Sequence, residues 1–178
     1  MPEIRADIPS VLWDLSTVGR LRCEPLARKL KGYSPSVVVT SIEPKAVQTG
    51  TIVAQNLGIP ALSFTGLHEH ERAEVVSGIR GNFETLLANF FAKPKKLVFG
   101  RETAEQALER FLHAMKDVFL KYPAGNTVVV THGTVITLWT TNLVGGDPFT
   151  FWKRLGMPSM VVFSRPDLKL IKVIENVE

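Results

Sequence analysis

The chain is poor in cysteine and histidine, and it lacks long apolar runs. Its 178 residues include one cysteine, Cys23, and four histidines, of which His68 is the first. A single cysteine excludes an internal disulfide and a cysteine-rich metal site, and it is typical of a reducing compartment. The sequence contains no signal peptide and no apolar run of membrane-spanning length. We therefore expect a cytoplasmic protein without a membrane partner.

Charge and composition narrow the classes of partner. The net charge is +4 and the isoelectric point about 9.3, which favours small anionic substrates. The basic residues are scattered apart from Lys93, Lys95 and Lys96, and no basic stripe alternates with aromatic residues, so we expect no nucleic-acid partner. A hydrophobic content of 45% in a chain of this length fits one domain, residues 1–178.

The stretch TVVVTHGTVITL, residues 127–138, joins a predicted strand to a predicted helix. The β-branched run Val128–Val130 is typical of a strand buried on both faces of a parallel sheet. Open α/β sheets bind ligands at the carboxyl ends of such strands, and Gly133 and the first helical turn offer close backbone approach and free N–H groups to an anion. His132 is therefore predicted to face a phosphate or carboxylate. The alternative is a structural histidine whose ring bonds to a carbonyl group.

A second strand-to-turn segment repeats this arrangement. Residues 36–40, SVVVT, predict a buried strand, and the following helix starts near Pro44 and ends at Gly58, before a short strand over 59–64. This unit places Ser41 and Lys45 at the carboxyl end of the first strand. A lone lysine in a first helical turn is often only solvated, but the recurrence of the His132 arrangement favours a shared anion site.

The segment GLHEHER, residues 66–72, is the densest polar cluster in the sequence. In extended backbone His68 and His70 lie on the same side, so they could chelate one metal ion while Glu69 points away. The spacing lacks a convincing third ligand. The alternative, which we favour, is that Glu69 points into the anion site as a proton donor and that the protein holds no metal.

The remaining segments complete an alternation of helices and strands. A helix is expected from the N-cap Ser16 toward Leu30, with a kink or a later start because of Pro25. The other expected elements are a helix capped by Asn82 that runs through Phe91 and packs over the sheet or covers the site, a long helix that begins with a capping box of Thr103 and Gln106, a short helix at Trp152, and a hairpin of residues 160–163 and 168–174.

Four motifs in order make the chain resemble the histidine phosphatase superfamily, also called phosphoglycerate mutase-like. They are WDLSTVGR at residues 13–20, TSIEPKAVQT at 40–49, Leu67-His68-Glu69, and the strand and turn at 128–133. The resemblance extends over nearly the whole chain. Together with the alternating elements, it implies a three-layer α/β/α sandwich around a mostly parallel sheet.

The resemblance also implies a chemistry, phosphoryl transfer to a histidine followed by hydrolysis, without a cofactor or metal ion. On this reading His132 is the second histidine of the site, Glu69 protonates the leaving oxygen, and Lys45 stands where the family has arginine. Ser41 and Gly133 would complete the phosphate-binding turns. The implied substrate is a small phosphorylated metabolite or a phosphoprotein.

One feature of the family is missing from the sequence. In the family the first strand lies inside the sheet and ends in an Arg-His-Gly or Arg-His-Ser turn that bears the nucleophile, but residues 1–13 contain no histidine and Arg5 is not followed by one. The chain is therefore expected to be either an N-terminally incomplete phosphomonoesterase or a phosphate-ligand sensor without catalysis. Glu69 favours the first, because an anion sensor gains nothing from a carboxylate at the leaving-group side.

Overall fold

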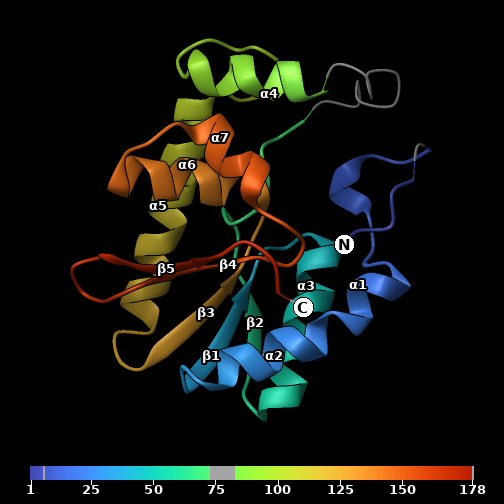
Figure 1. Cartoon of the computed structure of the whole chain (residues 1–178), viewed down its shortest axis with the longest axis vertical. Helices are drawn as coiled ribbons and strands as arrows, with labels where there is room; N and C mark the ends of the chain where they lie inside the picture. The colour runs from blue at the N-terminus through green and yellow to red at the C-terminus, as the bar shows by residue number, and fades with distance from the viewer. Residues whose placement is uncertain (6, 73–82, 178) are drawn as a thin grey trace.

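The computed structural model describes residues 1–5, 7–72 and 83–177, in which helices cover both faces of a small sheet (Figure 1). The predicted cap Asn82 lies outside the described residues. The helices are η1 (Ser10–Leu12), α1 (Thr17–Leu21), α2 (Cys23–Lys31), α3 (Pro44–Leu57), α4 (Phe83–Ala92), α5 (Ala104–Lys121), α6 (Gly133–Val144) and α7 (Pro148–Arg154), and the strands are β1 (Pro35–Thr40), β2 (Ala61–Ser63), β3 (Asn126–Val130), β4 (Met160–Phe163) and β5 (Leu170–Ile174).

The central sheet has the order β2-β1-β3, and both pairings are parallel. Successive side chains of β1 point to opposite faces, as the period of a strand requires. Val38 packs in one core cluster with α2 and α3, whereas Val37 and Val39 pack in a second cluster with α5 and α6. The three-layer α/β/α sandwich is therefore confirmed, with α2 and α3 on one side of the sheet and α5 on the other (Figure 1).

The antiparallel hairpin β4-β5 forms a second sheet, which is not hydrogen-bonded to the first among the described residues. Val162 of β4 packs in the α2/α3 cluster and Phe163 in the α5/α6 cluster. A cavity of about 120 Å³ lies where β3 and β4 face α5 and α6, and its lining includes Val129, Val161, Phe111 and Trp139. We call this space the β3–β4 slot.

The slot changes the environment predicted for β3. Val128–Val130 contact both core clusters, as a strand covered on both faces should, but they are only half-buried. The reason is that β3 pairs with β1 along one edge and borders the slot along the other. Full burial of this run, which the sequence predicted, is therefore wrong for the described chain.

The amino-terminal helix is divided in two. Ser16 caps α1, because its Oγ accepts a hydrogen bond from the N–H of Gly19 at 3.1 Å. The chain then turns at Arg22 and α2 starts at Cys23. Pro25 thus falls in the first turn of α2, where no helical N–H bond is required. The predicted kink or restart is confirmed.

The apolar helix α4 does not pack over the sheet. It lies at the end of the molecule, where Phe90 contacts His70 of the loop after β2. Its buried residues Leu87, Phe90 and Phe91 form a third core cluster with α5, α6 and α7 (Figure 1). The capping box of Thr103 and Gln106 at the start of α5 is present, with both of its hydrogen bonds. None of the described helices is both long enough and apolar enough to cross a bilayer.

Candidate functional site

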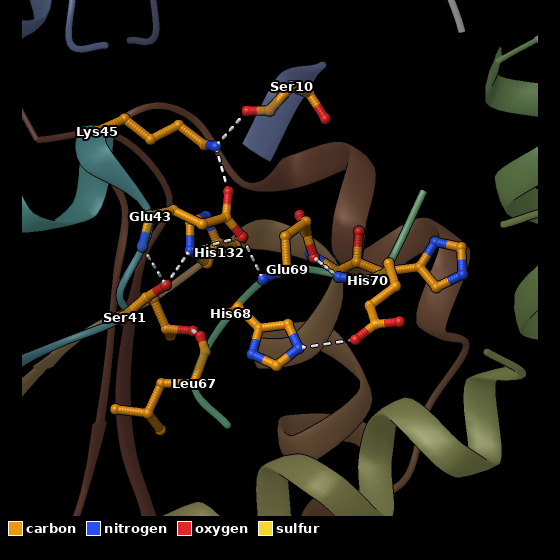
Figure 2. A network of polar contacts seen from close by, with 12 residues as sticks. Ser10, Ser41, Glu43, Lys45, Leu67, His68, Glu69, His70 and His132 are labelled. Carbon is orange, nitrogen blue, oxygen red and sulfur yellow. Dashed lines mark hydrogen bonds and ion pairs between the residues drawn. The ribbon is translucent and has the colours of Figure 1, made fainter. Parts of the chain in front are cut away.

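Three loops meet at the carboxyl ends of the parallel strands (Figure 2). Ser41 follows β1, residues 66–72 follow β2, and His132 follows β3. Parallel pairing brings these three strand ends to one edge of the sheet. The loops are also tied directly, since the Thr131 hydroxyl donates to the Leu67 carbonyl at 2.7 Å.

His132 is buried at the start of α6, and its ring faces the turn after β1. Its Nε2 lies 2.8 Å from Ser41 Oγ and 3.4 Å from Glu43 Oε1. Nε2 is therefore bonded to a hydroxyl and not to a carbonyl group. Burial lowers the pKa of His132, and the Glu43 and Glu69 carboxylates only partly offset this effect. The ring is neutral at neutral pH.

Glu43 occupies the centre of the cluster, although sequence analysis did not select it. Its side chain is 3% exposed. One oxygen, Oε1, accepts a hydrogen bond from the Glu69 N–H at 2.7 Å and faces His132, while Oε2 forms an ion pair with Lys45 Nζ. Lys45 also donates to the Ser10 carbonyl at 2.7 Å. The sequence assigned Lys45 and His132 to one anion site. In the structure both contact the Glu43 carboxylate, Lys45 at Oε2 and His132 at Oε1.

The only sequence signal for Glu43 was its position between two predicted site residues. It immediately precedes Pro44, the first residue of α3, and lies between Ser41 and Lys45. The resemblance leaves this position unspecified. A carboxylate is unexpected among residues that should bind an anion, and this could have identified Glu43 as a site residue.

Glu69 lies in the cluster as predicted, but as an ionised carboxylate. Its Oε1 accepts from the His70 N–H at 2.9 Å, and its Oε2 accepts from the Thr134 N–H at 3.2 Å and from Arg72 at 3.1 Å. Burial alone would raise the pKa of Glu69, but Arg72, His132 and the two N–H donors lower it to about 2. The anion at the α6 N-terminus, expected next to Gly133, is therefore Glu69 itself.

Two arginines that sequence analysis missed hold this loop. Arg72 donates to the Thr134 hydroxyl at 2.9 Å in addition to Glu69. From α5, Arg110 donates to the carbonyl groups of Gly66 at 2.8 Å and His68 at 3.0 Å, and it pairs with the Glu102 carboxylate at 2.6 Å. Arg72 lies in the polar cluster 66–72, but its contact with Thr134 depends on the position of α6. Arg110 contacts that cluster from α5, a segment distant in sequence, so no local pattern assigned a role to it.

The rings of His68 and His70 do not share a site. His70 is buried against Phe90, and its Nε2 lies 3.1 Å from the Glu102 carbonyl oxygen. His68 Nε2 instead lies 3.4 Å from the Glu71 carboxylate. Within residues 1–5, 7–72 and 83–177, no three histidine, cysteine, aspartate or glutamate side chains form a metal-binding group. The geometry gives no support to the metal-site alternative.

The low pKa of Glu69 predicts a contribution to stability at neutral pH. Because this pKa is about 2 in the folded state and ordinarily about 4.3, ionised Glu69 stabilises the fold by about 3 kcal/mol above pH 4.3, and this is lost as the pH falls toward 2. We expect Glu69→Gln to lower the free energy of unfolding at neutral pH and to flatten its dependence between pH 4.3 and 2. Urea unfolding from pH 2 to 7 measures both effects.

The matched control is Glu24→Gln, which removes an exposed carboxylate paired with Arg28. Exposed pairs contribute little, so this variant should follow the wild type over the whole pH range. Equal acid sensitivity of Glu69→Gln and the wild type would contradict the assignment of the low pKa.

Comparisons with known proteins agree with this architecture. The family model of the histidine phosphatase superfamily (branch 1) matches residues 5–165. The uncharacterized phosphatase PhoE of Bacillus subtilis is 25% identical over 146 residues, which cover 81% of this chain and 69% of that protein.

Solved structures share the fold at low sequence identity. The α-ribazole phosphatase from Shigella flexneri has a TM-score of 0.72 and 16% identity, covering 98% of this chain and 93% of its own. A mutant phosphoserine phosphatase from Entamoeba histolytica, in complex with phosphoserine, has a TM-score of 0.66 and 15% identity, covering 91% and 84%. Since the family model spans most of the sequence and the fold agrees, the chain belongs to the histidine phosphatase superfamily.

Proposed function

We propose that this domain is a metal-independent phosphomonoesterase that works through a phosphohistidine, with the nucleophilic histidine supplied by a strand that is not part of these 178 residues. The observation that carries the proposal is the convergence of Ser41, Lys45, Glu69 and His132 where β1, β2 and β3 end. Phosphoryl transfer requires mainly positioning and charge stabilisation, and these residue types supply both.

Each residue has a role in this proposal. Lys45 and Arg72 offer positive charge to the non-bridging oxygens, and neutral His132 offers a ring N–H. Lysine lacks the two-pronged geometry of arginine, so the phosphate is held less rigidly at Lys45. Glu69 would protonate the leaving oxygen. Its low pKa opposes that role until a bound phosphate draws Arg72 away and adds negative charge, both of which raise the pKa.

The β3–β4 slot supports the proposal of an additional strand because the described sheet leaves this edge of β3 unpaired. At about 120 Å³ the slot is smaller than a strand, so β4 must move away from β3 to admit one. A strand parallel to β3 in the slot would end at the same edge of the sheet as His132. Half-buried apolar side chains of β3 and β4 border the space, among them Val129 and Phe163. A histidine at the end of such a strand would face the anion site from the side opposite β1.

The substrate class that we propose is a small phosphate monoester or a phosphoprotein. Structures of related fold contain phosphoserine and, in a mycobacterial glucosyl-3-phosphoglycerate phosphatase, inorganic phosphate. Both ligands carry the dianionic group that a cluster of lysine, arginine and helix N–H groups recognises.

Phosphate binding tests the site without requiring turnover. We expect the 178-residue chain to bind orthovanadate and inorganic phosphate weakly, and Lys45→Met to weaken this binding at least about tenfold, because loss of one close charge is worth at least about 1.4 kcal/mol. Calorimetric titration measures both affinities. Lys29→Met, at an exposed position on α2, is the matched control and should leave them unchanged.

A chelator provides the second arm of this test. The proposed chemistry needs no metal ion, so EDTA should leave phosphate binding unchanged. Stoichiometric zinc held by His68 and His70, with binding lost on its removal, would contradict the proposal. If Lys45→Met and Lys29→Met bind phosphate with equal affinity, Lys45 is not part of the phosphate site.

A further inference from the structure

The Glu43 carboxylate binds two groups that a bound phosphate would need, the Glu69 N–H and the Lys45 ammonium group, and it lies next to a third, His132 (Figure 2). Its Oε1 accepts the Glu69 N–H at 2.7 Å and lies 3.4 Å from His132 Nε2, and its Oε2 takes the ammonium group of Lys45. These are a backbone N–H, an imidazole and a cation, the donor types that coordinate phosphate oxygens. Glu43 therefore occupies the position of a ligand.

The charges of the described cluster are already balanced. Glu43 is paired with Lys45, and Glu69 is paired with Arg72. All four side chains are at most 16% exposed, so the pairs are poorly screened by solvent. A phosphate dianion that entered beside an unmoved Glu43 would meet a like charge within a few ångströms and find no unpaired cation.

We propose that Glu43 is a built-in competitor of the substrate phosphate and so determines the affinity of the site. Binding requires its carboxylate to leave Lys45, His132 and the Glu69 N–H, whose places the phosphate oxygens then take. This inference rests on the proposed function, because it assumes that the cluster is the phosphate site.

The local structure allows the carboxylate to move while the backbone stays in place. The N–H of Glu43 is held by Ser41 Oγ at 3.2 Å, and α3 is anchored by its own buried face, which includes Ala46 and Val53. The side chain can rotate about its own bonds without disturbing either contact. Lys45 stays near the site through its second acceptor, the Ser10 carbonyl.

Glu43→Gln tests the competition directly. The amide oxygen of glutamine can still accept the Glu69 N–H, so the loop keeps its anchor, but Lys45 is released from its ion pair. We expect inorganic phosphate to bind at least about tenfold more tightly to this variant than to the wild type, by calorimetric titration of the 178-residue chain. Glu24→Gln, which removes an exposed carboxylate, should match the wild type.

The outcomes separate this inference from the proposed function. If phosphate binds Glu43→Gln no more tightly than the wild type, while Lys45→Met still weakens binding, the competition is wrong and the anion site stands. If neither the wild type nor Glu43→Gln binds phosphate, the cluster is not a phosphate site, and both proposals fail.

A measurement on the unmodified protein guards against a variant that does not fold. The Glu69 amide should change its ¹⁵N–¹H chemical shift as phosphate saturates the site, because its acceptor is exchanged from Glu43 to a phosphate oxygen. The Glu71 N–H, which donates to Glu102 Oε1 at 3.0 Å, is the internal reference and should move little. An unchanged Glu69 resonance at saturation would show that Glu43 stays in place and would overturn the inference.

Discussion

The 178-residue chain should hydrolyse p-nitrophenyl phosphate only at a trace rate, and an extended protein with a strand ending in Arg-His-Gly and a short linker before Met1 should be several orders of magnitude faster. The reason is that, in the proposed mechanism, the nucleophile of the covalent step comes from a strand outside these 178 residues. In a well-studied unrelated hydrolase, loss of the nucleophile costs about a million-fold in turnover, while binding and charge stabilisation retain about a thousand-fold over water. Lys45, Arg72 and His132 would supply the residual here.

The experiment compares turnover of the two proteins on p-nitrophenyl phosphate and on an alkyl phosphate. In the extended protein, replacing the added histidine by alanine is the matched control and should return turnover to the trace level. Glu69→Gln in the same protein should slow the alkyl phosphate far more than p-nitrophenyl phosphate, because only the alkoxide leaving group needs a proton from Glu69.

Two results would contradict this assignment in different ways. Full activity of the 178-residue chain, abolished by His132→Ala, would make His132 the nucleophile. Inactivity of the extended protein, with phosphate binding intact, would favour a phosphate-ligand sensor. A trace rate in the 178-residue chain together with fast turnover in the extended protein is expected only if the added strand supplies the nucleophile.

The fold follows from local rules that the sequence displays. The valine runs of β1 and β3, Pro44 at the first position of α3 and the capping box of α5 each restrict the backbone through neighbouring residues alone. Such restrictions can be identified without knowing what the segment contacts. For this reason most element boundaries differ from the predicted ones by only a few residues.

The centre of the site was less predictable, because its interactions join distant segments. Glu43 reaches the Glu69 N–H and His132, and Arg72 reaches Thr134 at the start of α6. Burial and pairing of these charges depend on which loops meet at the sheet edge. The sequence identified Glu69 as a site residue, but it could not show that Arg72 keeps the Glu69 carboxylate ionised. Because of this pairing, Glu69 can donate a proton only after its pKa has been raised.

The half-burial of β3 has the same origin. A run such as Val128–Val130 indicates that both faces of a strand are covered, and both are. It contains no information on whether both edges are paired, since edge pairing uses backbone groups that all residues share. The family resemblance implied that an interior strand is missing from the sheet, but the location of the β3–β4 slot emerged only from the arrangement of the strands.

The second large effect expected from the added strand is on stability. The edges of β3 and β4 that border the slot carry backbone N–H and C=O groups that the described sheet does not pair. Leaving one such group buried without a partner costs about 1–3 kcal/mol, and a domain of this kind has a total margin of about 5–15 kcal/mol. A strand that pairs with both edges and covers Val129 and Phe163 should therefore raise the free energy of unfolding by several kcal/mol.

This gain should raise the melting temperature of the extended protein by roughly 10 °C, since about 1 kcal/mol corresponds to 2–4 °C at this chain length. Circular dichroism measures the transition, and hydrogen exchange of the β3 and β4 amides shows whether protection increases at the slot.

The control is an extension of equal length with prolines at alternate positions, which cannot donate ladder hydrogen bonds and should give no gain. If both extended proteins melt at the temperature of the 178-residue chain, the slot does not accept a strand. A gain in turnover without a gain in melting temperature would mean that the added histidine reaches the site from a flexible segment and not from the sheet.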